Sequence, residues 1–476
     1  MTVWEEAMES QTFEFIEALE RKGFRADART LTGTVGVDTD AVRVEIVLPD
    51  GFPFMPPVAW PPKDFPRSWH RERSGAMCLY PADDRQSLPW LDVDDFLALV
   101  TRWIEESKAG WPGDFPDLDL ERYFEQCTDP LVVYGDLDEL TNKFVQLRHH
   151  GQFTRVTGSG AIPKKKRVAK NRAFGYVTDM GEPEQPPSSW DDLKTVIPAD
   201  DAALIEKAVG EGRFSYLIVR YSRGGVGAAV VLGIWKDKAD TYKLASVRSA
   251  SEAPATLVLR AGVHADVLAG ARVAVVGVGA IGSFLCDLLS RSGIGHITAY
   301  DPDIIKPGNL IRHLADCGSV GLTKPVAVKK VIESRAYSST VVEAVAARVP
   351  SPSEAMSLFS GHDLVIDASA SGDVTPALVA IAKAGDHRLL SVCLQDEGGV
   401  VRVDIIPPLN GDPMEETKLN PPPARDEMRF EAGCGDPVSQ TPAFAVYEAA
   451  ALAARHAIGL LTGAPLSDAG TVRDYR

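Results

Sequence analysis

Hydrophobic and polar residues follow three different patterns along this chain. In the first part, FEFIEALERKGF has apolar residues at helical spacing, AVRVEIVLP alternates as a strand does, and VDDFLALVTRWIEES predicts a second helix. Between residues 112 and 262, breaker-rich stretches such as PGDFPDLDL interrupt the strand-like segments RFSYLIVRYS and GAAVVLGIW. From residue 263 onward, strand and helix patterns alternate from ARVAVVGVG to DLVIDAS.

These patterns predict a multidomain protein with α+β and α/β parts. We expect an α+β domain in residues 1–111, a small middle domain in residues 112–262, and a doubly wound, Rossmann-like α/β domain in residues 263–476. Helices that alternate with strands cover both faces of a parallel sheet, whose carboxyl edge is the usual place for a nucleotide. The nucleotide site is therefore expected in the third domain.

Composition and charge narrow the partners. The chain has 476 residues, 45% of them hydrophobic, and a formal charge of −16. Such a charge repels nucleic acid backbones and anionic lipid surfaces. The acidic start MTVWEEAMES is unlike a signal peptide, and no stretch approaches the apolar length that crosses a bilayer. We expect a cytoplasmic protein that binds neither nucleic acid nor membrane.

The six cysteines are scattered and include no C-x-x-C pair, which argues against a disulfide framework and a structural zinc site. Each cysteine is then either core filler or a nucleophile. Cys286 lies on the apolar side of a helix, Cys317 just after a polar cluster, and Cys393 in the strand-like LLSVCLQ. We expect all three to serve packing. Cys78 and Cys434 are the candidate nucleophiles.

A glycine-rich turn follows the first strand of the third domain. Residues 271–276 run into Gly277, Gly279 and Gly282, which open a helix. Glycines let the backbone approach a phosphate, and the helix N-terminus favours an anion there. Asp301 ends the next strand, 19 residues after Gly282, where its carboxylate can accept hydrogen bonds from ribose hydroxyls. By itself this fingerprint suits a nicotinamide oxidoreductase equally well.

The polar segment DPDIIKPGNLIRH, which begins at Asp301, favours nucleotidyl transfer because hydride transfer has no need for this cluster. Arg312 and Lys324 are suited to hold a triphosphate and the departing pyrophosphate. Asp367, at the end of the apolar strand DLVID, is suited to hold Mg²⁺. Surface ion pairs are the alternative for these side chains.

These residues resemble the ThiF and MoeB group of adenylyltransferases, to which the activating enzymes of ubiquitin-like proteins belong. The resemblance rests on GVGAIG, DPDIIKPGNLIRH, GLTK and DLVIDAS. It implies that the three glycines of the turn cradle ATP, with further contacts from Asp301 to the ribose, from Asn309, Arg312 and Lys324 to the phosphates, and from Asp367 to magnesium. Relatives often have Gln where this chain has His313, so we assign that histidine no role.

Cys434 lies in EAGCGDP, a glycine-rich loop before an apolar helix. A loop keeps a thiol accessible, and a nearby helix N-terminus favours the thiolate. Activating enzymes that form a thioester have a cysteine in this place, so the resemblance implies that Cys434 takes the acyl group from the adenylate. ThiF and MoeB relatives also carry zinc-binding C-x-x-C pairs, which this chain lacks. A cysteine retained for structure is the alternative.

The first domain resembles ubiquitin-conjugating enzymes. The turn LPDGFPFMPP is followed by His70 and then by GAMCL, which contains Cys78. The resemblance implies that Cys78 receives the modifier as a thioester. The His-Pro-Asn motif of most relatives is absent, its nearest equivalent being the His-Arg-Glu that starts at His70, so either another donor stabilises the oxyanion or the transfer step is slower. A degenerate domain in which Cys78 is merely buried is the alternative.

The order of the two resemblances, conjugating then activating, predicts one reaction sequence. With ATP and Mg²⁺, a protein C-terminal carboxylate becomes an acyl adenylate, the acyl group passes to Cys434 and then to Cys78, and an amine on a target takes it as an amide. The arrangement resembles fusions in bacterial CBASS antiphage operons. That resemblance implies a homodimer, a role in antiviral defence, and a cGAS-like nucleotidyltransferase as acyl donor, whereas related operons use a ubiquitin-like protein. A sulfur-carrier adenylyltransferase without conjugating activity, a nicotinamide oxidoreductase and a non-enzymatic scaffold are the rival interpretations.

Overall fold

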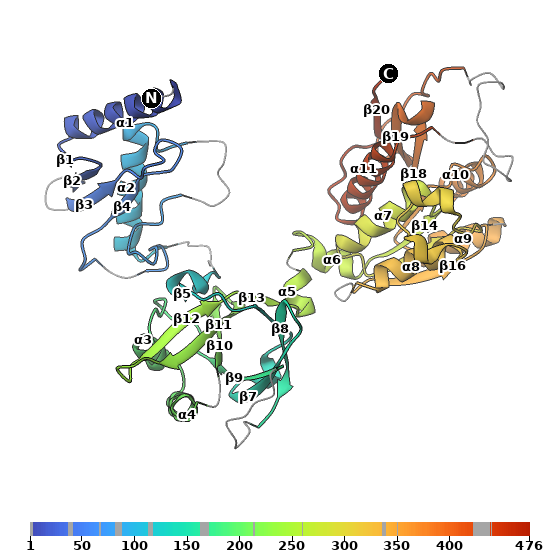
Figure 1. Ribbon diagram of the computed structural model, residues 1–476. Helices are drawn as coiled ribbons and strands as arrows, with labels where there is room; N and C mark the ends of the chain where they lie inside the picture. The colour runs from blue at the N-terminus through green and yellow to red at the C-terminus, as the bar shows by residue number, and fades with distance from the viewer. Residues whose placement is uncertain are drawn as a thin grey trace. The chain divides into compact units, whose positions relative to one another are not determined.

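The computed structural model of the chain divides into two compact units, Met1–Glu252 and Ala253–Arg476 (Figure 1). It describes residues 3–36, 41–65, 68–80, 88–112, 118–161, 171–212, 215–258, 260–335, 339–349, 351–421, 438 and 440–476. The division into three domains at residues 111 and 262 stays a prediction.

The first unit begins with an α+β layout, as the sequence predicts. Helix α1 (Val3–Arg21) precedes an antiparallel sheet in the order β1-β2-β3-β4, and helix α2 (Val93–Ala109) follows it (Figure 1). In β3 the side chains of Val42, Val44 and Ile46 are buried, and the residues between them are exposed, which is the alternation seen in the sequence. The strands are β1 (Arg25–Asp27), β2 (Thr30–Val35), β3 (Val42–Val47) and β4 (Val58–Trp60).

Helix α2 is defined at both ends by its capping residues. The Asp92 carboxylate accepts hydrogen bonds from the N–H groups of Asp94 and Asp95, and Gly110 ends the helix with a left-handed φ of 77°. Its apolar face, which includes Phe96, packs in the core of the four-stranded sheet. The helix is therefore anchored on the four-stranded sheet and ends at Gly110, before the chain continues to the nine-stranded sheet.

A nine-stranded sheet forms the rest of the first unit, in the order β13-β6-β8-β7-β9-β10-β11-β12-β5. Helices α3 (Trp190–Val196) and α4 (Ala199–Gly210) connect β9 to its parallel neighbour β10. The short helices are η2 (Leu120–Tyr123) and η3 (Asp138–Leu140). The strands are β5 (Glu125–Gln126), β6 (Leu131–Tyr134), β7 (Lys143–His149), β8 (Phe153–Ser159), β9 (Arg172–Asp179), β10 (Tyr216–Arg223), β11 (Val226–Lys236), β12 (Tyr242–Val247) and β13 (Ser249–Ser251).

Trp69 joins the two parts of the first unit. Although it follows the four-stranded sheet in sequence, its side chain is 5% exposed and lies in the core of the nine-stranded sheet. Its ring packs edge-on against Tyr123 and is stacked with Tyr221, with centroids 5.7 and 6.2 Å away. The chain segment around Trp69 is thus held by both parts.

The second unit is built on a seven-stranded sheet in the order β16-β15-β14-β17-β18-β19-β20. Neighbours from β16 to β18 are parallel, whereas β19 and β20 add antiparallel strands at one edge. The strand order reverses at β14, which lies between β15 and β17. The strands are β14 (Arg272–Val276), β15 (His296–Tyr300), β16 (Val341–Val345), β17 (Leu364–Asp367), β18 (Leu389–Gln395), β19 (Val400–Ile406) and β20 (Gly470–Asp474).

Helices cover both faces of this sheet, so the predicted Rossmann-like α/β fold is confirmed. Val273 and Val275 of β14 pack in one core with α7, α8 and α11, and Ala274 and Val276 pack in a second core with α9 and α10. The helices are α5 (Pro254–Val258), α6 (Ala265–Ala269), α7 (Ala280–Arg291), α8 (Lys324–Glu333), α9 (Pro352–Gly361), α10 (Val374–Ala384) and α11 (Ala443–Leu461), with the short turns η4 (Pro307–Arg312), η5 (Cys317–Ser319) and η6 (Asp396–Gly398).

Helix α11 corrects one expectation about the sequence. It is long and apolar enough, by length and composition, to cross a membrane, although no stretch of that kind was expected. In the structure 56% of its apolar window is buried. Ala449, Ala450 and Ala453 lie in the core that α11 shares with α7 and the sheet. The apolar length of α11 is therefore used for packing inside the second unit.

Candidate functional site

A cavity of about 550 Å³ lies beside the glycine-rich turn between β14 and α7. Its volume is within the range of about 300–1,000 Å³ that is usual for small-molecule sites. Because β14 is the strand where the sheet order reverses, its carboxyl end is where a doubly wound fold binds ligands. The polar or charged residues in its wall are Tyr300, Asp301, Asp303, Arg312, Lys324, Arg348, Ser369, Ser371 and Thr441.

Close backbone contacts require glycine at two positions of the turn. Gly277 has a φ of 85°, and a Cβ atom there would lie 2.5 Å from the Cα of Ser369. A Cβ atom on Gly282 would lie 1.9 Å from the carbonyl oxygen of Gly277. Gly279 precedes α7, and no side chain in the described residues caps that helix end. The first N–H groups of α7 are thus available to an anion.

Asp301 directly follows β15 and holds the turn from one side. Its Oδ2 accepts a hydrogen bond from the N–H of Val278 at 3.0 Å, and its Oδ1 accepts one from the N–H of Asp303 at 2.9 Å. Only 6% of the residue is exposed. Burial raises the pKa of this carboxyl, and the two backbone N–H groups and Lys324 oppose that shift.

Arg312 and Lys324 bring positive charge to the same cavity. Lys324 lies 2.7 Å from the Asp303 carboxylate and 3.6 Å from that of Asp301. Arg312 donates from Nη1 to the carbonyl oxygen of Thr441 at 3.2 Å. The structure therefore gathers Gly277, Gly279, Asp301, Arg312 and Lys324, which the sequence singled out, around one space.

Three residues predicted for the nucleotide site are not in the cavity wall, namely Gly282, Asn309 and Asp367. The Asn309 side chain accepts a hydrogen bond from the N–H of Lys306 at 2.9 Å and so shapes the turn η4, and Asn309 is not in the cavity wall. Asp367 is 1% exposed. Its carboxylate accepts hydrogen bonds from the N–H and hydroxyl of Ser369 at 3.0 and 2.6 Å and from the hydroxyl of Thr375 at 2.5 Å.

Hydrogen bonds already engage the carboxylate that is expected to hold magnesium. Ser369 and Thr375 engage both oxygens of the buried Asp367 carboxylate. Across the described ranges, no group of three or more His, Cys, Asp or Glu side chains is arranged to hold a metal. We derive no chemical step through a metal, and the role of Asp367 as a magnesium ligand stays a prediction.

His313 was assigned no role from the sequence, yet it supports the glycine-rich turn. It is 5% exposed, its Nδ1 accepts a hydrogen bond from the N–H of Ala315 at 3.0 Å, and its Nε2 lies 2.9 Å from the carbonyl oxygen of Val278. Because Nδ1 must accept, Nε2 carries the proton and donates to Val278. Burial lowers the pKa of His313 to about 4, so the ring is neutral at physiological pH.

Arg348 is a second residue that the sequence reading missed. It lines the cavity, and its Nη2 donates to both carboxylate oxygens of Asp373 at 2.7 and 2.6 Å. Hydrogen bonds from Ser371 and from Arg348 lower the pKa of Asp373 to about 2. The position of Arg348 just after β16 was the available signal, because ligands of doubly wound sheets bind at the carboxyl ends of strands.

The described cysteines of the second unit differ in their exposure. Cys434 lies outside the described residues. Cys286 is buried in the core, as predicted, and Cys393 is partly buried. Cys317 is exposed, so the expectation that it serves packing is wrong, because the short turn η5 leaves it on the surface.

Cys78, the candidate nucleophile of the first unit, is half-buried. Its N–H donates to the carbonyl oxygen of His70 at 3.0 Å, and the His70 ring stacks on Trp111 with centroids 3.7 Å apart. Burial and the nearby Glu72 carboxylate raise the pKa of the Cys78 thiol, and Arg122 acts in the opposite direction. The thiol is therefore protonated at neutral pH in this conformation.

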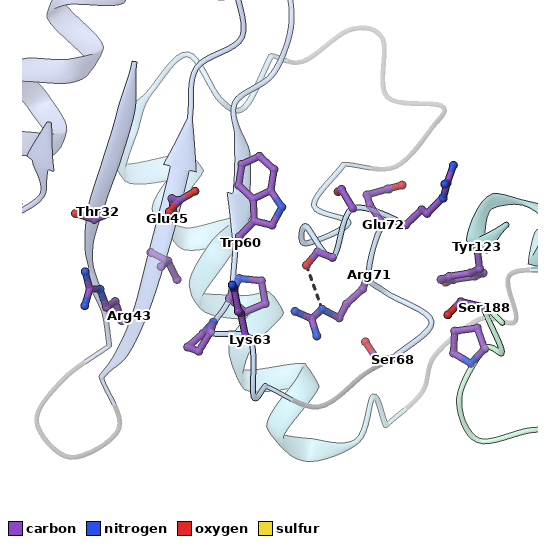
Figure 2. Close-up of a pocket in the computed structure, with 17 residues that line it drawn as sticks. Thr32, Arg43, Glu45, Trp60, Lys63, Ser68, Arg71, Glu72, Tyr123 and Ser188 are labelled. Carbon is purple, nitrogen blue, oxygen red and sulfur yellow. Dashed lines mark hydrogen bonds between the residues drawn. The ribbon is translucent and has the colours of Figure 1, made fainter. Parts of the chain in front are cut away.

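A groove of about 920 Å³ runs beside the loop that carries Glu72. Figure 2 shows Thr32, Arg43, Glu45 and Trp60 on the strands of the four-stranded sheet, Arg71 and Glu72 on the loop, and Tyr123 and Ser188 on the opposite side. The groove is formed wholly by residues of the first unit.

A protein-family model matches most of the second unit. Residues 258–473 match the model of the ThiF family. The ATP-dependent ubiquitin transferase-like protein Cap2 of Vibrio cholerae serotype O1 is 31% identical over 116 residues, which are 24% of this chain and 19% of that protein. The adenylyltransferase and sulfurtransferase UBA4 of Yarrowia lipolytica is 36% identical over 96 residues, which are 20% of this chain and 24% of that protein. The chain thus spans only a minor part of the length of these relatives.

Among solved structures, E. coli MccB with ATP is 18% identical, with 46% of this chain and 65% of that chain covered and a TM-score of 0.34. E. coli tRNA N6-threonylcarbamoyladenosine dehydratase, TcdA, in complex with ATP is 28% identical, with coverage of 28% and 57% and a TM-score of 0.26. The strand order, the glycine-rich turn and the sequence match agree on one assignment. The second unit of this chain carries a ThiF-family domain, over residues 258–473.

Proposed function

We propose that the ThiF-family domain binds ATP at the turn between β14 and α7 and transfers the adenylyl group to a protein C-terminal carboxylate. The observation that carries this proposal is a single cavity walled by the glycine-rich turn, the Asp301 carboxylate and the cations of Arg312 and Lys324. The ThiF family match supports it, as do relatives named for ATP-dependent transfer and for adenylyl transfer.

In this proposal each wall of the cavity has one task. The N–H groups at the start of α7 bind phosphate oxygens, and Asp301 accepts hydrogen bonds from the ribose hydroxyls. A carboxylate oxygen of the substrate attacks the α-phosphorus, the bond from that phosphorus to the bridging oxygen breaks, and pyrophosphate leaves. Arg312 and Lys324 stabilise the charge that develops on the leaving group. Asp303 holds Lys324 ready for this task through an ion pair of 2.7 Å.

Arg312 and Lys324 also distinguish the proposed adenylyltransferase from a nicotinamide oxidoreductase. Thermal unfolding in the presence of MgATP or NAD tests the choice, because a ligand that binds only the folded state raises Tm. We expect MgATP to raise Tm and NAD to have little effect. Arg312→Ala should lose most of the MgATP shift. Arg291→Ala, which removes an exposed Arg paired with Asp287 outside the cavity, should keep it. A larger shift with NAD than with MgATP would reject the proposal.

We further propose that the chain attaches the activated C-terminal carboxylate to an amine of a target protein. Cys434 takes the acyl group from the adenylate, Cys78 receives it as a second thioester, and a target amine takes it as an amide. The half-buried Cys78 thiol lies on the hairpin whose Glu72 lines the groove, which supports this role, as does the transferase-like name of Cap2. A cGAS-like nucleotidyltransferase or a ubiquitin-like protein is the proposed acyl donor, a homodimer the proposed assembly, and bacterial antiviral defence the proposed setting.

A further inference from the structure

A short hairpin places Glu72 next to Cys78. Arg71 and Met77 form an antiparallel bridge, and the N–H of Cys78 donates to the carbonyl oxygen of His70 at 3.0 Å. The N–H of Glu72 donates to the carbonyl oxygen of Ala76 at 2.8 Å, so Glu72 and Cys78 lie diagonally across the bridge and on the same face of the hairpin. The Glu72 carboxylate raises the pKa of the Cys78 thiol.

Arg122 reaches the same hairpin from η2, which precedes the nine-stranded sheet. Its Nη2 donates to the carbonyl oxygen of Trp69 and, at 2.9 Å, to the hydroxyl of Tyr123. The Trp69 ring is itself covered by the Arg223 guanidinium, 4.4 Å from the ring centroid. These contacts fix the start of the hairpin relative to Arg122, whose positive charge lowers the pKa of the Cys78 thiol.

Glu72 also faces the groove. It lines the groove together with four cationic side chains and with Tyr123, the residue after Arg122 (Figure 2). Cys78 is not part of the groove wall, so Glu72 is the residue that links the groove to the hairpin carrying Cys78. The cations are those of Arg43, Lys63, Arg71 and Arg73.

We propose that Glu72 and Arg122 complete the acyl-transfer site of Cys78. Arg122 stabilises the oxyanion that forms on the thioester carbonyl, and Glu72 takes the proton of the attacking amine, which arrives through the groove. The proposal rests on the proposed role of Cys78 as an acyl carrier. It also answers the absence of the His-Pro-Asn motif, because Arg122 offers the missing oxyanion donor from outside the four-stranded sheet.

The step balances without a further reactant. The amine nitrogen attacks the thioester carbon, a C–N bond forms, and negative charge collects on the carbonyl oxygen beside Arg122. Glu72 carries the proton released by the amine. The C–S bond then breaks, and the proton passes from Glu72 to the Cys78 thiolate, which restores the thiol and leaves an amide.

Alkylation of Cys78 by iodoacetamide tests the two neighbours in the full chain without nucleotide or acyl donor. The rate is followed by mass spectrometry of the Cys78 peptide between pH 6.5 and pH 9.5, because the thiolate is the reacting form. Glu72→Gln should raise the rate at pH 7.5 by about threefold or more, and Arg122→Met should lower it by a similar factor, as half a pKa unit would do. Arg21→Met, at the exposed end of α1 and outside the groove, should leave it unchanged.

Discharge of a thioester tests the chemistry. Cys78 is loaded by exchange with a short peptide that ends in a glycine thioester, and free lysine is the acceptor. Glu72→Gln should slow discharge by about tenfold or more even though it makes the thiol more reactive, and Arg122→Met should slow it as well. If Glu72 had only a structural role, Glu72→Gln would not speed up alkylation and slow down discharge at the same time. If Arg122→Met does not fold, Arg122→Lys should discharge at an intermediate rate.

The outcomes separate the two proposals. Alkylation profiles that do not move in Glu72→Gln and Arg122→Met overturn the assignment of both side chains. Profiles that move while discharge stays at the wild-type rate overturn their catalytic role. If the alkylation profiles move but wild-type Cys78 never forms a thioester, the proposed role of Cys78 as an acyl carrier is rejected. The proposed acyl-transfer site is then rejected as well.

Discussion

Nε2 of His313 donates a hydrogen bond to the carbonyl oxygen of Val278 across 2.9 Å. Asp301 holds the same residue from the other side, because its Oδ2 accepts from the N–H of Val278 at 3.0 Å. Both backbone polar groups of Val278, between Gly277 and Gly279, are thus engaged by buried side chains. The turn that is proposed to bind phosphate is preorganised by two residues that lie behind it.

The pH dependence of stability should report the His313 contact. Burial lowers the pKa of this histidine from 6.5 to about 4, so between these values the unfolded chain binds a proton that the folded chain does not. The free energy of unfolding should therefore fall as the pH drops from 6.5 to 4. His313→Gln keeps a donor and an acceptor but does not titrate, and should lose less stability across this window. Equal slopes for both proteins, measured by urea unfolding at several pH values, would contradict the assignment.

Gly282→Ala should damage the turn through a single methyl group. Its Cβ atom would lie 1.9 Å from the carbonyl oxygen of Gly277, so the backbone has to move. We expect the free energy of unfolding to fall by about 1–3 kcal/mol and the MgATP shift in Tm to shrink. Gly361→Ala is the matched control, since Gly361 also lies in a helix but has no atom within 4 Å of an added Cβ. That variant should gain up to about 1 kcal/mol.

Local patterns in the sequence were sufficient to predict the α/β part of the fold and the glycine-rich turn. The alternation of strands and helices predicted the doubly wound sheet, and the spacing from Gly282 to Asp301 placed both at its carboxyl edge. The nine-stranded sheet was not foreseen at that size, because its strands are separated by segments rich in proline, glycine and charge. Strand pairing over such distances is decided by tertiary contacts, which periodicity does not record.

The site was predicted less completely than the fold. Asp367 ends its strand as expected, but its partner Thr375 comes from the start of α10, and no pattern in the sequence indicates that the two side chains meet. His313 belongs to the polar segment after Asp301, yet its inward direction depends on the turn η4. Cys317 is exposed for a similar reason. Residue types identify the chemistry available to a site, whereas side-chain direction depends on the packing of several elements.

Two variants separate a structural from a metal-binding role of Asp367. Thr375→Val and Asp367→Asn both weaken the hydrogen bond at Oδ2, so each should lower the free energy of unfolding by about 1–3 kcal/mol. Only Asp367→Asn removes the negative charge. If the carboxylate binds magnesium, only that variant should need several-fold more Mg²⁺ for half-maximal ATP–pyrophosphate exchange. The same Mg²⁺ requirement in wild type and Asp367→Asn would leave Asp367 with a structural role alone.

The order of acyl transfer follows from the placement of the two candidate thiols. Cys434 belongs in sequence to the ThiF-family domain, and Cys78 lies in the first unit, where the described residues include no nucleotide cavity of the kind found beside β14. Only Cys434 is expected to meet the adenylate. With MgATP and its acyl donor, the chain should form a thiol-sensitive adduct that survives Cys78→Ala and is lost in Cys434→Ala.

Transfer to an amine should fail in both cysteine variants, because each thiol serves one of two consecutive steps. Gel analysis with and without reducing agent distinguishes thioester from amide. Cys317→Ala is the matched control, since that cysteine is exposed and has no assigned role. If Cys434→Ala still charges Cys78, the acyl group passes straight from the adenylate and Cys434 is structural. If Cys78→Ala still modifies the target, the first unit serves docking, and Glu72 and Arg122 have no acyl group to act on.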